Sequence, residues 1–224
     1  NRVADRVYCA NAVSNDVTVI DCATNGVTAV VPLSSRPSAL CYSTQSNKVY
    51  CANYYSARVT VIDGVTDSVQ GIVSVGGYPW ALCYDSASDK VYCANQGSDS
   101  VAVIDCASNA VVAKVAAGVT PWDLCCNTVN DKIYCSNWEG GNVTVIDGRA
   151  DTVIATVSVG YLPRVLCYNP IDNKVYCALE TRNTVRVIGG AADSVIASVA
   201  VGNNPAALSY NLWHTKVYLS LIHI

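Results

Sequence analysis

Short runs of alternating apolar and polar residues follow one another along the whole chain, separated by turn residues. In the segment 37–78, the runs at 38–42, 48–53, 58–62 and 68–75 are rich in Val, Ile, Tyr and Cys. The segments between them hold Asp, Asn, Gly and Ser. Alternation with a period of two predicts β-strands, and none of these runs has the period of a helix. The unit is therefore four short antiparallel strands joined by tight turns.

This unit recurs at a fixed interval. Its second strand carries a basic residue, an aliphatic residue, a Tyr and usually a Cys, as in Lys48-Val49-Tyr50-Cys51. The copies begin at residues 6, 48, 90, 132, 174 and 216, so the repeat is 42 residues long. A four-stranded repeat of this length is typical of a β-propeller blade, whereas a β-sandwich would not repeat its sequence and a β-solenoid repeats at shorter intervals. We predict an all-β chain that forms a β-propeller.

The repeat places one propeller domain at residues 1–218. We expect blades at about 1–36, 37–78, 79–120, 121–162 and 163–204, with a closing or partial blade at 205–218. Two arrangements fit five full periods. The strand at the start of the last segment could complete the first blade and close a five-bladed ring, which would hide free strand edges. Alternatively, the chain is part of a propeller with seven blades, and we favour this arrangement for the natural protein.

Both ends of the chain differ from those expected of an intact gene product. The sequence has no Met and begins just before a running repeat. The segment 219–224 (LSLIHI) resembles the translation of a sequencing-library adapter, although Leu219 and Ser220 also fit a strand of a sixth repeat. We therefore expect a metagenomic fragment of a longer gene product with a non-native tail at 219–224.

Composition argues against several classes of function. Apolar residues make up 51% of the chain and charged residues 14%, as expected for strands that are buried on both faces. No apolar run approaches the ~18 residues of a membrane-spanning helix, so we predict no membrane span in this segment. The formal net charge is -3 and the basic residues are scattered. Nucleic-acid-binding proteins usually present a basic patch, so we expect no nucleic-acid partner.

The chain also resembles a known family at the level of the repeat. The segments 47–53 (NKVYCAN), 75–82 (VGGYPWAL) and 101–105 (VAVID) are similar to the YVTN-type β-propeller repeats of surface-layer and secreted proteins. The resemblance extends to about Tyr218, but Cys replaces the Val or Ala that is usual in the second strand. It implies a propeller that commonly has seven blades. It also implies a location outside the cell or at the cell surface, with the periplasm as an alternative.

The chain has twelve cysteines, and most of them occupy two repeated positions. One position lies in the first strand of a blade and the other in the second strand, on either side of a turn. If the two are cross-strand neighbours, they are close enough for a disulfide, which would suit an oxidising compartment. The alternative, which we favour, is that Cys acts as a small buried apolar residue. The pairs in question are Cys41 and Cys51, Cys83 and Cys93, Cys125 and Cys135, and Cys167 and Cys177.

Residues suited to catalysis or to a resident cofactor are scarce. The repeated acids Asp21, Asp63, Asp105 and Asp147 stand at the same turn of successive blades, where Asp usually caps backbone amides. The two His residues are too few for the usual catalytic metal sites or for haem ligation. No CxxC spacing, phosphate-binding loop or hydrolase signature is present. We therefore predict no catalytic residue, no metal and no cofactor.

Positions that differ between otherwise equal blades are the best sequence clue to function, because the blade does not dictate them. Large aromatic or charged residues follow the Pro that opens a first strand, and others follow the second strand. Both positions lie on the same face of a propeller, so we expect a single rim. The alternative is that the aromatic residues fill the space between blades, since Trp is usually mostly buried. The candidate rim residues are Tyr54, Trp80, Trp122, Asp123, Trp138, Arg164 and Glu180.

The sequence thus predicts a non-catalytic, secreted or cell-surface β-propeller that binds a protein or a glycan through this rim. Trp, Tyr and Arg are the residue types enriched in binding hot spots. The competing hypothesis is a lactonase-like or quinoprotein-like propeller enzyme with a site at the central channel, which would need acids, His or Arg that converge there. One propeller face supports unrelated functions, so the choice depends on the residues of the site.

Overall fold

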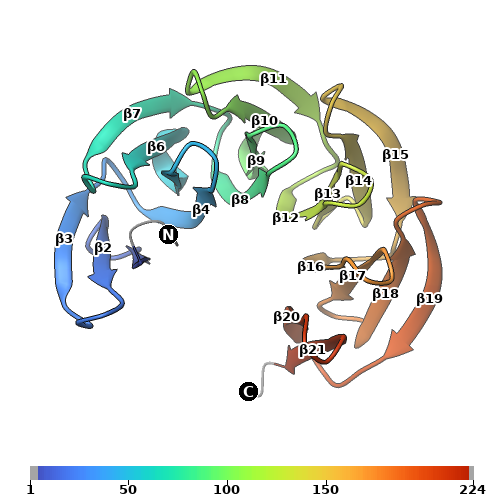
Figure 1. Cartoon of the computed structure of the whole chain (residues 1–224). Helices are drawn as coiled ribbons and strands as arrows, with labels where there is room; N and C mark the ends of the chain where they lie inside the picture. Colours follow the sequence, from blue (N-terminus) through green and yellow to red (C-terminus); the bar gives the residue numbers. More distant parts are fainter. Residues whose placement is uncertain (1–4, 222–224) are drawn as a thin grey trace. The chain divides into compact units, whose positions relative to one another are not determined.

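The computed structural model describes residues 5–221, which form antiparallel β-strands (Figure 1). The chain divides into two compact units, Asn1–Lys114 and Val115–Ile224. Consecutive strands pair into sheets, called blades below, and four of the blades have four strands each. The prediction of an all-β chain built from four-stranded antiparallel blades is confirmed. Within the described part of the chain, no helix has the length and apolar character needed to cross a membrane.

The first unit begins with a three-stranded blade, formed by β1 (Arg6–Asn11), β2 (Asp16–Asp21) and β3 (Val27–Pro32). The next blade is formed by β4 (Pro37–Ser43), β5 (Lys48–Asn53), β6 (Arg58–Asp63) and β7 (Val69–Ser74). It is followed by β8 (Pro79–Asp85), β9 (Lys90–Asn95), β10 (Ser100–Asp105) and β11 (Ala110–Ala116). The short 3-10 turns η1 (Tyr54–Ser56) and η2 (Gln96–Ser98) follow β5 and β9.

The second unit begins with β12 (Pro121–Asn127), β13 (Lys132–Asn137), β14 (Asn142–Asp147) and β15 (Thr152–Ser158). The next blade is formed by β16 (Pro163–Asn169), β17 (Lys174–Leu179), β18 (Thr184–Gly189) and β19 (Ser194–Ala200). The last sheet has two strands, β20 (Pro205–Asn211) and β21 (Lys216–Leu221). Leu219 and Ser220 thus lie in a strand, whereas residues 222–224 of the expected tail lie outside the described residues. The number of blades in the propeller stays a prediction.

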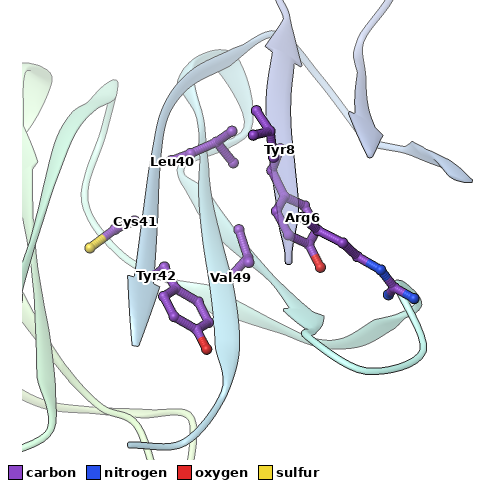
Figure 2. A pocket seen from close by; sticks show the side chains of 7 residues that line it. Arg6, Tyr8, Leu40, Cys41, Tyr42 and Val49 are labelled. Atoms are coloured by element: carbon purple, nitrogen blue, oxygen red, sulfur yellow. The ribbon is translucent and has the colours of Figure 1, made fainter. Parts of the chain in front are cut away.

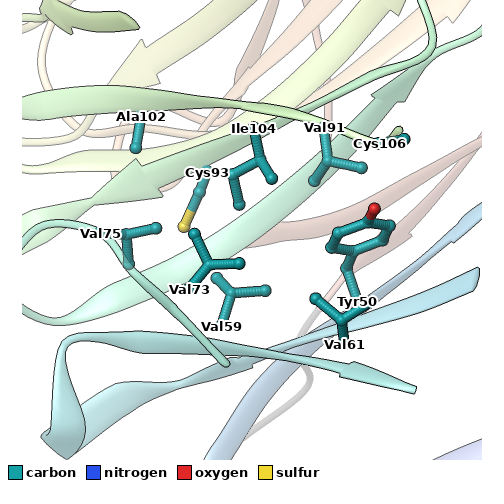
Figure 3. Packing of buried hydrophobic residues seen from close by; sticks show 10 residues of the cluster. All are labelled: Tyr50, Val59, Val61, Val73, Val75, Val91, Cys93, Ala102, Ile104 and Cys106. Carbon is teal, nitrogen blue, oxygen red and sulfur yellow. The ribbon is translucent and has the colours of Figure 1, made fainter. Parts of the chain in front are cut away.

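The second strand β5 separates its side chains onto two faces that pack against different blades. In β5, Tyr50 packs with Val59 and Val61 against the blade β8–β11 (Figure 3). Val49 and Cys51 point to the other face of β5 and pack against β2 and β3. This is the alternation expected of a strand with a side-chain period of two. The core therefore lies between blades, and the apolar residues of both faces are buried in it.

A polar contact closes each of these cores where it approaches the solvent. Tyr50 donates a hydrogen bond from its hydroxyl to Asn109 Oδ1 at 3.0 Å, and Lys48 Nζ donates to the same oxygen at 3.1 Å. Asn109 lies in the turn between β10 and β11, one blade further along the chain. Its φ of 55° is in the left-handed region, which Asn and Asp tolerate better than other residues with a side chain.

The same contact recurs in two other places, and we call it the Tyr–Asx latch. Arg6 and Tyr8 donate to the carboxylate of Asp67, with Tyr8 Oη 2.6 Å from Oδ1. In the second unit, Lys132 Nζ lies 2.6 Å from Asp193 Oδ2, and the Tyr134 hydroxyl donates to Oδ1 of the same carboxylate. The latch therefore explains why a basic residue and a Tyr recur together in the second strand.

The repeated acids have the role that the sequence predicted. Asp63 Oδ1 accepts the backbone N–H groups of Val65 and Thr66 at 2.9 and 2.8 Å. These two N–H donors, that of Thr66 first, hold the pKa of Asp63 below its usual range. Corresponding caps are made by Asp21, Asp105 and Asp147. The prediction of turn caps is confirmed.

The hypothesis that the repeated cysteines are cross-strand neighbours, and could therefore form disulfides, is wrong. In the β4–β5 hairpin, Cys41 lies opposite Tyr50, and Cys51 lies opposite Leu40. The turn of four residues between Ser43 and Lys48 sets this register, which offsets the two cysteines by one residue and directs them to opposite faces. The other three hairpins have the same offset: Cys83 and Cys93, Cys125 and Cys135, and Cys167 and Cys177. All twelve cysteines lie in the described residues and are free thiols.

Because only Cys9 and Cys22 are exposed and half of the thiols are buried, we expect most of them to be inert as well as unpaired. Burial raises the pKa of Cys51 to about 12, so its nucleophilic thiolate is rare at neutral pH. Alkylation of the denatured protein without reductant should label all twelve cysteines, and dithiothreitol should leave the melting temperature unchanged. In the native protein, the exposed Cys9 and Cys22 should react first. A lower number of labels without reductant than with it would show that disulfides exist.

The latch should contribute measurably to stability. Tyr134→Phe removes the hydroxyl from Asp193, whose carboxylate is only 14% exposed. We expect urea unfolding to show a loss of about 1–3 kcal/mol, the usual effect of removing a hydrogen bond to a charged group. The matched control is Tyr176→Phe in the next blade, because the Tyr176 hydroxyl has no hydrogen-bond partner within residues 5–221. Equal losses in the two variants would contradict a specific role for the latch.

Candidate binding surface at the blade loops

A recurring backbone hydrogen bond positions the candidate residues. The first residue after a second strand donates its N–H to the residue that precedes the Pro of the same blade. In the blade β4–β7 the bond joins Tyr54 N to Arg36 O at 2.8 Å, and in β12–β15 it joins Trp138 N to Thr120 O, also at 2.8 Å. The loop between second and third strands is thereby fixed against the start of the first strand. The two sets of variable positions lie together within each unit for this reason.

In the first unit, the aromatic cluster consists of Tyr54, Tyr55, Tyr78 and Trp80. The rings of Tyr54 and Tyr78 are stacked with their centroids 5.0 Å apart, and Trp80 meets Tyr54 edge-on at 5.6 Å. Arg36 lies over the Tyr54 ring, with Cζ 5.8 Å from the centroid. The outer members of the cluster are accessible, since Tyr55 is 66% and Tyr78 49% exposed.

In the second unit, the indole cluster consists of Trp122 and Trp138, whose ring centroids are 5.2 Å apart. The indole N–H of Trp138 donates to Glu180 Oε2 at 3.2 Å. Arg164 donates to Glu180 Oε1 at 2.8 Å, and this ion pair is about a quarter exposed, 27% for Arg164 and 26% for Glu180. Glu180 thus uses both carboxylate oxygens to hold its neighbours in place.

Asp123 binds backbone N–H groups instead of contacting the other candidate residues. Its Oδ1 accepts the backbone N–H of Leu124 at 2.9 Å, and its Oδ2 accepts that of Leu166 in the neighbouring blade at 2.8 Å. Burial raises the pKa of Asp123 to about 6, even though the two N–H donors act in the opposite direction. Its carboxylate therefore bridges two blades through their backbone. In the other blades the same position is occupied by Ala39, Ala81, Val165 and Ala207.

The clusters contain features of both alternatives that the sequence left open. Tyr54, Trp80, Trp122 and Trp138 are all half-buried, so each ring packs against neighbours and also reaches the surface. Tyr54 meets Trp80 in the first unit, and the second unit brings together Trp122, Trp138, Arg164 and Glu180, as expected for a rim. Asp123 does not join them, because its carboxylate binds the backbone of two blades. A single rim would include residues of both units, and it stays a prediction.

Sequence reasoning missed Tyr78, a member of the aromatic cluster, and Arg36, which lies over the ring of Tyr54. Both residues directly precede the Pro of a first strand. The signal was available, because this position also varies between blades: Arg36, Tyr78, Thr120, Leu162 and Asn204.

A separate hollow of about 270 Å³ lies in the first unit beside the edge strand β1 (Figure 2). The one charged residue in its lining is Arg6, and that guanidinium is already paired with Asp67 in the latch. The hollow therefore offers a polar ligand little to bind. Its lining residues are Arg6, Val7, Tyr8, Leu40, Cys41, Tyr42 and Val49. In the described residues, no three His, Cys, Asp or Glu side chains are grouped so as to hold a metal ion.

Comparisons with known proteins confirm the predicted β-propeller fold. Residues 4–150 match the family model of the YNCE-like beta-propeller. No curated protein matches the chain. Among solved structures, hydrazine synthase from Kuenenia stuttgartiensis is similar, with a TM-score of 0.72 and 21% sequence identity. The match covers 78% of this chain and 52% of the hydrazine synthase chain, about half of its length. At this identity the likeness shows the fold alone.

The environment of Asp123 predicts a specific pH dependence of stability. Its pKa is about 6 in the folded protein, above the ordinary value of 3.8, so the folded state favours the protonated form. The free energy of unfolding should therefore fall as the pH rises from about 4 to about 6, and then level off. Asp123→Asn keeps an acceptor oxygen and removes the ionisation, so its stability should lack this decrease. Melting curves of the two proteins across this range would measure the difference, and identical profiles would contradict the assignment.

Proposed function

Because this chain belongs to the YNCE-like β-propeller family, we propose that it is a non-catalytic module that binds a protein or glycan partner through its blade loops. The observation that supports this most directly is the aromatic cluster. Tyr54 contacts both Tyr78 and Trp80 where the loop meets the start of a first strand, and Tyr78 is 49% exposed. The resemblance to YVTN-type repeats supports a location outside the cell or at the cell surface.

The aromatic cluster has the properties of a preformed binding surface. Tyr54 is held by ring contacts with Tyr78 and Trp80 and by Arg36 over its face. Rings fixed in this way lose little conformational entropy when a ligand binds. Aromatic faces stack on the apolar faces of sugar rings and on apolar side chains, and Tyr adds a hydroxyl for hydrogen bonding. A glycan or a protein loop is therefore the class of partner that fits.

The indole cluster fits the same function. Arg164 compensates the charge of Glu180, and Trp138 satisfies its other oxygen, so the group presents indole surface more than net charge. An ion pair that is about a quarter exposed contributes little by itself to stability. Its main effect is to fix the orientation of Trp138 against Trp122.

The non-catalytic part of the proposal is supported by the bonding of Asp123, the one side-chain carboxylate within residues 5–221 whose pKa is raised. Asp123 would be the natural candidate for a general acid or base, since its pKa is about 6. Both of its oxygens, however, accept backbone N–H groups, from Leu124 and Leu166. A carboxylate held in this way links the backbones of two blades, and this structural role accounts for both of its oxygens without a substrate.

The test is to measure binding of the purified protein to glycan and protein arrays, followed by titration of any ligand that is found. The variants carry residues found at the same position in other blades, which the fold accommodates. Tyr78→Asn places there the residue of Asn204, and Trp122→Ala that of Ala206. We expect each substitution to weaken binding about tenfold or more, as for hot-spot residues, with little change in melting temperature.

Trp213→Ala is the matched control. Trp213 is 93% exposed in the turn between β20 and β21, outside both clusters, so its removal should leave the affinity unchanged. Two results would contradict the proposal. One is the absence of any ligand, together with early melting of the cluster variants, which would identify the aromatic residues as packing between blades. The other is an equal loss of binding in the control.

A further inference from the structure

A polar cavity of about 480 Å³ lies in the second unit, at the loop end of the blade β16–β19. Its lining comes from the end of β17, the loop that follows it, β18, β19 and the linker that precedes β16. The lining contains two arginines and no acid. Its residues are Gly160, Leu179, Arg182, Thr184, Arg186 and Ser198.

This blade departs from the others at two coupled positions. The four preceding blades end the second strand with Asn, which in three of them donates a hydrogen bond to a Thr of the third strand, whereas the two-stranded sheet that follows has Leu221 at this position. The distances are 2.7 Å for Asn11 and Thr18, 2.8 Å for Asn53 and Thr60, and 2.9 Å for Asn137 and Thr144. In the blade β16–β19 the same positions are Leu179 and Arg186, which lie on one face of the sheet. A closed polar pair is thus replaced by an apolar residue and a cation.

Arg186 is held in position by its surroundings. Its Nε donates to the carbonyl of Val159 in the linker at 3.0 Å. Ser198 lies directly opposite on β19, so its hydroxyl shares the cavity with the guanidinium. Gly160, with a φ of 108°, lies in a backbone conformation that favours glycine, and it allows the linker to pass close to Leu179. The arginine is therefore anchored at one nitrogen.

The positive charge of the cavity has no compensating partner within residues 5–221. Neither Arg182 nor Arg186 forms an ion pair there, and the terminal nitrogens of Arg186 make no hydrogen bond. Glu180 is the acid on the same loop, and Arg164 and Trp138 occupy both of its oxygens. The cavity thus combines a hydroxyl group with two cations whose charge is not compensated by an acid.

We propose that this cavity binds an oxyanion, such as the carboxylate or phosphate group of a ligand. A guanidinium presents parallel N–H donors that match two oxygens of such a group. Arg186 supplies the fixed donors, Ser198 adds a hydroxyl, and Arg182 contributes from the loop. The site is distinct from the aromatic and indole clusters, so the two proposals can fail separately.

The experiment is isothermal titration of the protein with inorganic phosphate and, separately, with acetate, at constant ionic strength in chloride. We expect saturable binding of at least one anion at a single site. Arg186→Gln should weaken it about tenfold or more, because a charged hydrogen bond is lost. The sharper variant is Leu179→Asn with Arg186→Thr, which restores the pair found in the other blades. It should keep the melting temperature and lose the binding.

Arg149→Gln is the control, since the Arg149 side chain is 86% exposed and lies outside the cavity. If Arg186→Gln does not fold, the exposed Arg182→Gln replaces it and should weaken binding several-fold. Absence of saturable binding of either anion to the unmodified protein at millimolar concentration would overturn the proposal. Unchanged binding in the Leu179→Asn/Arg186→Thr protein would also overturn it. Variants of the aromatic cluster should bind the anion normally.

Discussion

The Tyr–Asx latch is the interaction on which the stacking of blades depends. In each described case, a Tyr and a basic residue reach from the second strand of one blade to an Asp or Asn in the outer turn of the next. The latch lies where two apolar faces meet, so it aligns the strands whose Val, Ile and Cys side chains form the core. Hydrophobic burial supplies most of the stabilisation. The latch specifies how the apolar faces of two neighbouring blades are aligned with each other.

Once the latch and the turn caps hold the blades, other positions can change without loss of the fold. The residue after the Pro is Ser38, Trp80, Trp122, Arg164 or Ala206, on equivalent backbones. The Asn–Thr pair at the end of the second strand can likewise become Leu179 and Arg186. Repetition separates the residues that build blades from those that are free to acquire a ligand. Both proposed sites lie at such positions.

The candidate sites depend on contacts that single positions do not reveal. Glu180 resembled a free rim acid in the sequence, yet it orients Trp138 and pairs with Arg164. Asp123 resembled a rim residue too, but its carboxylate links β12 to the backbone of β16. In both cases a partner lies in another blade, Trp138 for Glu180 and Leu166 for Asp123. Neighbours of this kind decide whether a charge is available to a ligand.

The sequence by itself determined the strands, their two faces and the capping role of Asp63 and its counterparts. These features are local, because a side-chain period of two and the turn chemistry of Asp act within a few residues. The tertiary structure decided that the cysteines do not pair. The length of the turn after Ser43 places Cys41 opposite Tyr50, one residue before Cys51. It also decided the pKa of Asp123 and the uncompensated charge of Arg186, because both depend on burial and on partners distant in the chain. A repeat specifies its own blade, whereas the space between blades exists only after they pack.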